Sequence, residues 1–454
     1  MSTHLAEWYN QAVQCFAEDR FDEAERLLLE IEKRSPNHPL VLSGLAFVEY
    51  SRQAYPQAIR LYQKALKLDD NQPESHNNLG SALWKIEKHI EALRSYTRAI
   101  QLKTDYAEAY YNRAVVWETL GQTRDALRDY ESALKYQPGN ARASLNRGFI
   151  HLFHLDFAAG WSAYEARWHV RELNARPLGL TLPEWHGDAL QGRLLVWDEQ
   201  GVGDQVLFAS LLPALRERVG QISLRVDDRL VSLFARSLPD IEVLPASQPL
   251  DTQRYDQQIA LGSLPRHFLG QAGDFTRLAF RYLQPDPIRR EQLKAAWAGM
   301  PRPWLGVAWR SINPHHDKSI PIEQIATALR GYPGTLINLQ YRHSAAELDT
   351  FDKIAGQPLV NDPQLDLFND LEAVVALISL CDRVVTISNV TAHLSGAQGV
   401  DTLLMVPGTT MHRHWYWHAN QGRSLWYPTV RVHTQSVIGR WQKVLGQVRK
   451  EVMG

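Results

Sequence analysis

The chain has 454 residues, of which 44% are hydrophobic and 22% charged, a composition that predicts two to four globular domains. Its 49 basic and 50 acidic residues leave a net charge of −1, which argues against a dedicated nucleic-acid binder, because such proteins usually carry a basic excess. Two distant cysteines, no secretory signal and no apolar run of about 18 residues predict a soluble, cytoplasmic protein with no membrane span.

The first third of the chain is built from a repeat of 34 residues. Alanine recurs at one phase (Ala24, Ala58, Ala92 and Ala126) and tyrosine at another (Tyr62, Tyr96, Tyr130 and Tyr164). This period, with a small residue where two helices touch, is typical of the tetratricopeptide repeat. We expect repeats to begin near Leu5, Pro39, Pro73 and Ala107, with a degenerate fifth near Ala141, in an array over residues 1–170.

Asparagine recurs on the expected first helix of three successive repeats, at Asn78, Asn112 and Asn146. An amide both donates and accepts hydrogen bonds, so such a column can hold the backbone of an extended peptide. Stacked repeats form an extended concave surface on which a protein partner can lie. Two interpretations stay open at this point: the asparagines bind a peptide, or they connect neighbouring helices. Gly44 takes this position in the second repeat, so the column is incomplete.

After a connector over residues 171–191, short apolar runs alternate with helical stretches, which is typical of parallel sheets. Two lobes are expected, residues 192–300 and 301–436, followed by a helical segment over 437–454. We expect strands near residues 194–197, 222–226, 241–244 and 257–260 in the first lobe, and near 305–309, 336–339, 384–387 and 403–406 in the second. The terminal helix, over 437–452, is expected to cross back over the first lobe.

Two turns carry the polar residues of the predicted cleft between these lobes, since ligands bind at the carboxyl ends of parallel strands. In the first lobe, the turn contains Gly201, Gly203 and Gln205 together with the carboxylate of Asp204. In the second lobe, a strand leads into Ser388, Asn389, Thr391, Ala392 and His393. The first N–H groups of a helix lack partners, so both turns are suited to an anion.

Five stretches resemble bacterial tetratricopeptide-repeat glycosyltransferases whose catalytic part is similar to the heptosyltransferase family: WDEQGVGDQVLFASLLPAL, GVAWRS followed by HHDKSIP, LINLQ, VVTISNVTAHLSGAQG and LWYPTVRV. The resemblance implies a helical superhelix followed by a GT-B fold of two Rossmann-like α/β domains. It also implies sugar transfer from a nucleotide-sugar to a hydroxyl of a protein acceptor held by the repeats, with flagellin as the suggested acceptor. Where many relatives have an Asp-Thr pair, this chain has Ser388-Asn389, so the donor stays open.

The resemblance also implies roles for single residues, and it places the loop with Gly201, Gly203 and Gln205 on the acceptor side. Asp204 corresponds to the proposed general base, Lys318 to a lysine on the donor phosphates, and the helix start at Thr391 to His393 to the diphosphate site. The alternatives are an N-cap for Asp204, a solvated loop charge for Lys318 and a packing role for His393. Arg310 is expected to stabilise the leaving phosphate with Lys318.

Further residues are assigned to the donor side. Gln340 ends an expected strand, and Trp415 lies in an aromatic run that either walls a donor pocket or packs between the lobes. No metal or cofactor is expected, because no Asp-x-Asp pair occurs and the nearby histidines lack a ligand spacing: His315, His316, His412, His414 and His418. The rival hypothesis is a peptide-binding scaffold whose transferase-like half is inactive.

Overall fold

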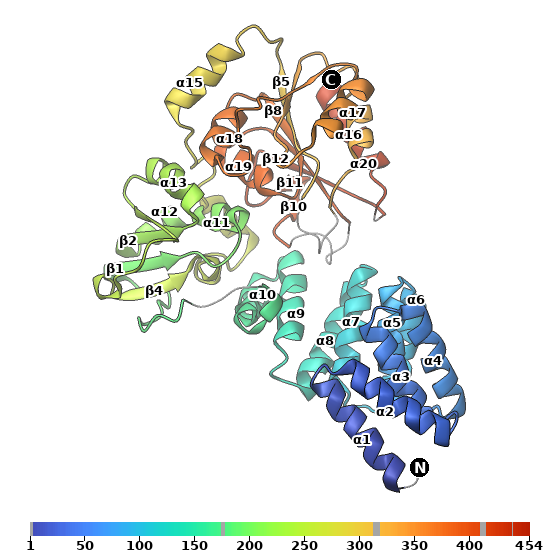
Figure 1. Cartoon of the computed structure of the whole chain (residues 1–454). Coiled ribbons are helices and arrows are strands. Elements are labelled where there is room, and N and C mark those ends of the chain that lie inside the picture. The colour runs from blue at the N-terminus through green and yellow to red at the C-terminus, as the bar shows by residue number, and fades with distance from the viewer. Residues whose placement is uncertain (1–2, 174–177, 312–317, 409–414, 438) are drawn as a thin grey trace. The chain divides into compact units, whose positions relative to one another are not determined.

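The computed structural model describes residues 3–173, 178–311, 318–408, 415–437 and 439–454. Contacts within the chain divide it into two units, Met1–Arg147 and Gly148–Gly454, and the boundary falls inside one helix (Figure 1). Within the described ranges, every helix is too short or too polar to span a bilayer.

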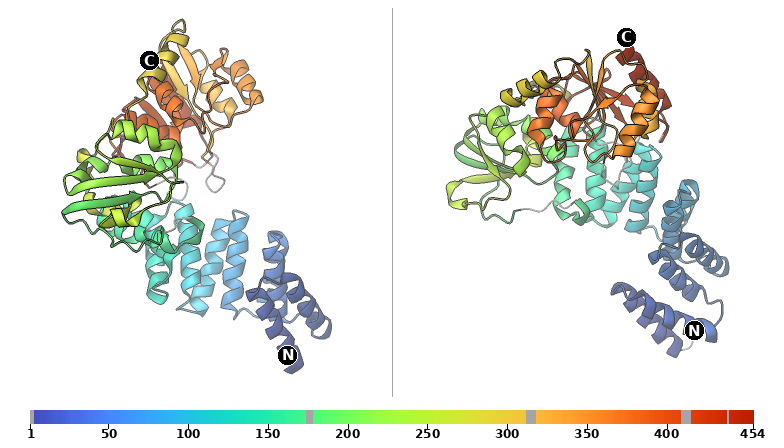
Figure 2. Two further views of the ribbon diagram at one scale, coloured as in Figure 1. Left: turned by 60° about the vertical axis from the view of Figure 1, so that its left-hand side comes forward. Right: turned by 45° about the horizontal axis from the view of Figure 1, so that its top comes forward.

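The repeats form helix pairs at the predicted spacing (Figures 1 and 2). The first helices are α1 (Thr3–Ala17), α3 (Pro39–Ser51), α5 (Pro73–Lys85), α7 (Ala107–Thr119) and α9 (Ala141–Phe153). The second helices are α2 (Phe21–Arg34), α4 (Tyr55–Leu68), α6 (His89–Leu102), α8 (Thr123–Tyr136) and α10 (Phe157–Tyr164). The repeat starts expected from the sequence are therefore confirmed.

Small residues let these helices approach one another, as the alanine column predicts. Ala58, Ala92 and Ala126 are fully buried. A Cβ atom on Gly80 of α5 would lie 2.7 Å from the Tyr96 ring of α6, so that tyrosine can pack there only over a glycine. Tyr96 and its small partner Gly80 thus close the α5–α6 pair.

The first sheet of the second unit has four parallel strands in the order β3-β2-β1-β4. They are β1 (Leu190–Trp197), β2 (Val219–Val226), β3 (Glu242–Pro245) and β4 (Gln257–Ala260). In the centre, Val196 lies opposite Leu224 on one side and Ile259 on the other. The helices that follow these strands include α11 (Val202–Ala209), α12 (Leu212–Arg216), α13 (Val231–Ser237) and α14 (Pro265–Phe268). All four strands lie where the apolar runs predict them.

The second sheet has eight strands in the order β10-β11-β12-β9-β8-β5-β6-β7. Four lie at the predicted runs: β5 (Trp304–Val307), β6 (Thr335–Asn338), β8 (Arg383–Ile387) and β9 (Thr402–Val406). Four others were not predicted: β7 (Leu359–Val360), β10 (Ala419–Asn420), β11 (Arg423–Ser424) and β12 (Val430–Thr434). Its helices are α16 (Ile322–Leu329), α17 (Ala345–Ala355), α18 (Leu371–Ile378) and α19 (Val390–Gln398), and α15 (Pro287–Ala296) precedes the sheet. The fold is thus a helical repeat array followed by α/β structure with one parallel sheet and one mixed sheet, in which β10, β11 and β12 are antiparallel and the remaining pairings are parallel.

The terminal helix corrects one expectation. Helix α20 (Gln442–Met453) begins later than predicted and packs on the second sheet, not over the first lobe. The apolar face of α20 is buried on this sheet: Val444 and Val448 belong to the core that the sheet forms with α16. Arg449 Nη1 also donates to the carbonyl of Ala328 at 2.8 Å.

Candidate functional site

Two helices begin close together at the carboxyl ends of strands from the two sheets. Helix α11 follows β1 and α19 follows β8, and the two helices pack against each other. A Cβ atom on Gly203 would lie 3.0 Å from Cδ2 of His393, so this glycine permits the close approach. The two predicted polar turns therefore meet, which brings Asp204 and His393 into one site.

Asp204 lies in the first turn of α11, and it is partly buried. The pKa of its carboxyl is raised to about 6, chiefly by burial and in smaller part by the charge of Glu199, against the opposing effects of Lys318 and of the backbone N–H groups of Gly201 and Asp204. The N-cap alternative is wrong in its simple form, because Gly201 occupies the N-cap position. The contact with the Gly201 N–H instead resembles the carboxylate half of a capping box.

Lys318 is the cation that faces this acid. It is only 2% exposed. Burial lowers the pKa of its ammonium group to about 8, and the charge of Asp204 opposes that shift. The alternative of a solvated loop charge for Lys318 is thus wrong. Asp204 and Lys318 interact electrostatically, and both titrate near neutral pH.

His393 is a neutral imidazole in an aromatic enclosure. Burial, with a smaller contribution from the charge of Lys318, lowers its pKa to about 3. Its Nδ1 lies 3.3 Å from the hydroxyl of Tyr427, and its ring centroid lies 4.7 Å from that of Trp417. These contacts are those of the packing alternative, and they leave Lys318 as the charged group beside Asp204.

Asn389 is the N-cap residue of α19, and its side-chain nitrogen is a donor that the described part of the chain does not use. Its Oδ1 accepts from the Ala392 N–H at 3.3 Å and from Thr386 Oγ1 at 3.1 Å. Its Nδ2 is buried and has no hydrogen-bond partner within the described ranges, although the residue is 8% exposed. Ser388 accepts from Trp417 Nε1 at 2.7 Å, and Thr391 is buried. The start of α19 therefore offers backbone N–H groups and an unused amide to an anion.

Gln340 and Arg310 are held by other contacts. The Oε1 atom of Gln340 accepts from the N–H groups of Trp309 at 2.9 Å and Arg310 at 2.7 Å, so it connects the ends of β5 and β6. The Arg310 guanidinium pairs with Glu347 at 3.4 Å and donates to the carbonyl of Arg342. Neither side chain makes a contact with Asp204 in the described part of the chain.

Gln205 fixes the first turn in place. Its Nε2 donates to the carbonyl of Gln200 at 2.9 Å, and its Oε1 accepts from the N–H of Asp227 at 2.9 Å. It thus connects the turn before α11 to the segment after β2. This role positions the loop that carries Asp204.

The site also contains a buried ion pair that the sequence did not reveal. Arg167 binds Glu199 through Nε and Nη2, both at 2.8 Å, and neither side chain is more than 1% exposed. Arg167 also donates to Glu165 at 2.7 Å and to Ser263 at 2.6 Å. Glu199 lies two residues after the end of β1 and raises the pKa of Asp204. No local pattern joins two residues that lie 32 positions apart.

The aromatic run around Trp415 is packed inside the second unit. The ring centroid of Trp415 lies 6.4 Å from that of Phe208 in the first lobe, and 5.0 Å and 5.8 Å from those of Trp161 and Tyr164. The residue is 7% exposed. These contacts are those of the packing alternative. His315, His316, His412 and His414 lie outside the described residues. Among the residues that are described, no group of three or more His, Cys, Asp or Glu side chains is placed to hold a metal ion.

The asparagine column connects neighbouring helices. Asn146 Nδ2 donates to the hydroxyl of Tyr130 at 3.1 Å, and Asn112 Nδ2 donates to Oδ1 of Asn77 at 3.0 Å. Asn78 accepts from Asn77 at 3.4 Å, a contact that stays within α5. The contacts of Asn112 and Asn146 therefore favour the second of the two interpretations, in which the column stabilises the array.

Comparison with known proteins identifies the repeats. Profiles described as TPR repeat or tetratricopeptide repeat match residues 48–86, 73–106 and 107–140. Protein FlbA of Caulobacter vibrioides is 29% identical over 310 residues, which cover 64% of this chain and 51% of that protein. The chain thus spans about half the length of this curated relative.

Two solved structures align with about a third of the chain. The crystal structure of MamA is 26% identical with a TM-score of 0.32, and it covers 36% of this chain and 94% of its own. The Pseudomonas aeruginosa pilF structure is 18% identical with a TM-score of 0.34, and it covers 36% of this chain and 74% of its own. The N-terminal part of the chain consists of tetratricopeptide repeats, a scaffold type that presents extended binding surfaces.

Proposed function

We propose that this chain acts in the cytoplasm and transfers a sugar from a nucleotide-sugar to a hydroxyl of a protein acceptor held by the repeats. Flagellin is the acceptor that the sequence resemblance suggests. The observation that carries the proposal is the pairing of Asp204 with Lys318 where the first turns of α11 and α19 meet. A base and a cation that titrate near neutral pH suit a reaction in which a proton is taken up and negative charge develops.

Asp204 acts as the general base in this proposal. As the acceptor oxygen bonds to the anomeric carbon of the sugar, its proton passes to the Asp204 carboxylate. The bond between that carbon and the phosphate oxygen breaks, and its electron pair leaves with the nucleotide diphosphate. A pKa of about 6 leaves the carboxylate largely ionised at neutral pH and still basic enough to accept the proton.

The leaving diphosphate is assigned to Lys318 and the start of α19. Lys318 with a pKa of about 8 is mostly protonated at neutral pH, so it stabilises the developing negative charge. The free N–H groups of α19 and the unused Nδ2 of Asn389 supply further donors, and the helix dipole has the same sign. The proposal includes no metal ion or cofactor.

The second candidate function is a peptide-binding scaffold without transferase activity. It is favoured by the engagement of Arg310 with Glu347 and by the neutral state of His393, because both reduce the positive charge available to a donor. The two candidates differ in whether any nucleotide binds at α19.

Two measurements on the full chain separate these functions. The first is the melting temperature in a panel of nucleoside diphosphates, since binding to the folded state raises it by mass action. The second is the intact mass of a co-purified acceptor, with Asp204→Asn as the test variant. Asp240→Asn is the matched control, because this acid is exposed and pairs with Arg216. Transfer that survives Asp204→Asn refutes the base assignment, and a wild type that neither binds a nucleotide nor transfers a sugar supports the scaffold.

A further inference from the structure

The second helices of the repeats carry a column of exposed arginines. Arg26, Arg60, Arg94 and Arg128 lie on α2, α4, α6 and α8, spaced by 34 residues, and all four are exposed. Seven positions further along, the same helices carry Lys33, Lys67, Gln101 and Lys135. Seven residues are about two helical turns, so both columns lie on one face of each helix. This periodic positive face is distinct from the asparagine column of the first helices.

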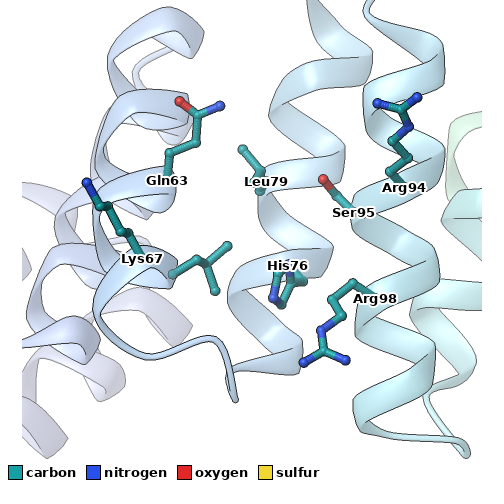
Figure 3. Close-up of a pocket in the computed structure, with 8 residues that line it drawn as sticks. Gln63, Lys67, His76, Leu79, Arg94, Ser95 and Arg98 are labelled. Carbon is teal, nitrogen blue, oxygen red and sulfur yellow. The ribbon is translucent and has the colours of Figure 1, made fainter.

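A pocket of about 360 Å³ opens on this face between α4, α5 and α6 (Figure 3). Its apolar lining is supplied by Leu66 and Leu79, which are 8% and 7% exposed. Lys67 and Arg94 lie on opposite sides of the pocket in the close-up, on α4 and α6. An apolar floor between two cations is suited to an apolar side chain flanked by carboxylates.

Some charged side chains of this pocket are paired with other protein groups, and others can pair with a ligand. Arg98 donates from Nε to Asp70 at 2.9 Å, and Nε2 of His76 lies 3.1 Å from the same carboxylate. This cluster closes one end of the pocket. Lys67 and Arg94 have no ion pair within the described part of the chain. The available charge is therefore positive, on both sides of the apolar floor.

A second pocket, of about 380 Å³, lies directly beside the first. Arg94 and Arg98 line both pockets, so Arg94 stands between them. The second is lined by Leu93, Trp117 and Ile90, and the last of these is 58% exposed. An exposed isoleucine beside an available arginine repeats the pairing of apolar surface and positive charge.

We propose that these two pockets bind an acidic peptide segment of a partner protein. An apolar side chain of the segment enters the pocket over Leu66 and Leu79, and its flanking carboxylates pair with Lys67 and Arg94. A second apolar side chain lies against Ile90. The apolar floor and the nearby Asp70 carboxylate favour a peptide over a nucleic acid, whose phosphates need an uninterrupted basic surface. This inference does not depend on sugar transfer, because no residue of the Asp204 site takes part.

The test uses the full-length chain and a fluorescein-labelled short peptide of glutamates that contains two leucines. Its anisotropy gives Kd at roughly 0.15 M salt, where exposed charges are screened beyond about 8 Å. The double reversal Lys67→Glu with Arg94→Glu should raise Kd roughly tenfold or more. Arg26→Glu is the matched control, since this arginine has the same repeat phase and exposure but lines neither pocket. It should leave Kd within about twofold.

Two altered peptides complete the test. Replacing the glutamates by glutamines, or the leucines by serines, should each weaken binding, because both the charge and the apolar anchors contribute. Equal melting temperatures of the variants establish that they are folded. The inference is overturned if the double variant binds as the wild type does, or if Arg26→Glu weakens binding equally. It is also overturned if a single-stranded oligonucleotide of equal charge binds more tightly with the same dependence on Arg94.

Discussion

Replacing Asp204 by asparagine should stabilise the folded chain at neutral pH, and the gain should shrink as the pH falls. The physical reason is the raised pKa of the carboxyl, which goes from an ordinary 3.8 to about 6 in the folded chain. The folded state therefore binds this proton more tightly than the unfolded state. The stability that comes from binding this proton is fully present below pH 3.8 and is lost as the pH rises through about 6.

The size of the effect follows from the two pKa values. A difference of about two units corresponds to about 3 kcal/mol over the whole titration, of which about 1.3 kcal/mol falls between pH 5 and 7. Lys318 titrates near 8, above this window, so in the wild type it stays charged throughout. The free energy of unfolding of Asp204→Asn minus that of the wild type should therefore fall by about 1.3 kcal/mol on going from pH 7 to pH 5.

Urea unfolding followed by tryptophan fluorescence measures this difference, in which the titrating groups that do not interact with Asp204 cancel. Asp227→Asn is the matched control. Its carboxyl is bonded to Arg229 at 2.8 Å, which lowers its pKa, so the control difference should be flat between pH 5 and 7. A flat profile for Asp204→Asn would refute the reasoning. So would a loss of stability at neutral pH, since that is the signature of a carboxylate that serves chiefly as a helix cap.

Three further predictions concern the neighbours of this acid. Lys318→Met removes the charge that lowers the pKa of the acid, so the pH midpoint of the stability difference should move upward; an unchanged midpoint contradicts the pairing. Gly203→Ala places a Cβ atom 3.0 Å from His393, so the free energy of unfolding in urea should fall by about 1–3 kcal/mol. An unchanged urea midpoint would mean that α11 and α19 can move apart without cost. Arg167→Met leaves Glu199 buried without its partner and should cost about 3–5 kcal/mol, which Glu199→Gln in the same chain should partly restore; a near-neutral single variant would show that the pair is not desolvated.

The repeats and most central strands could be predicted because their signals are local. Four alanines at one period locate the helix pairs, and uninterrupted apolar runs locate the strands of the two sheets. Strand β12 escaped prediction because Arg431 and His433 interrupt its apolar pattern. In the fold, the Arg431 guanidinium pairs with Asp401 at 2.8 Å, a partner 30 residues away that no local window contains.

The sequence predicted which segments form the site, but not the charge or the availability of the side chains in it. Resemblance to known transferases singled out Asp204, Lys318 and the start of α19, and the fold brings them together. Whether Arg310 is available depends on Glu347, and whether His393 is charged depends on the rings that enclose it. Such properties arise from tertiary neighbours and have no signature in spacing.

Tyr164 occupies the same repeat position as the three earlier tyrosines, but its surroundings in the structure differ from theirs. The earlier ones lie within the helical array, whereas Tyr164 accepts a hydrogen bond from Gln200 and packs beside Trp415. The last repeat thus belongs structurally to the α/β part, next to Asp204, although its sequence still follows the period of the array. A chimera that exchanges one repeat array for another should therefore join the chains before Gly148, because a later seam would replace part of the wall of the site along with the scaffold.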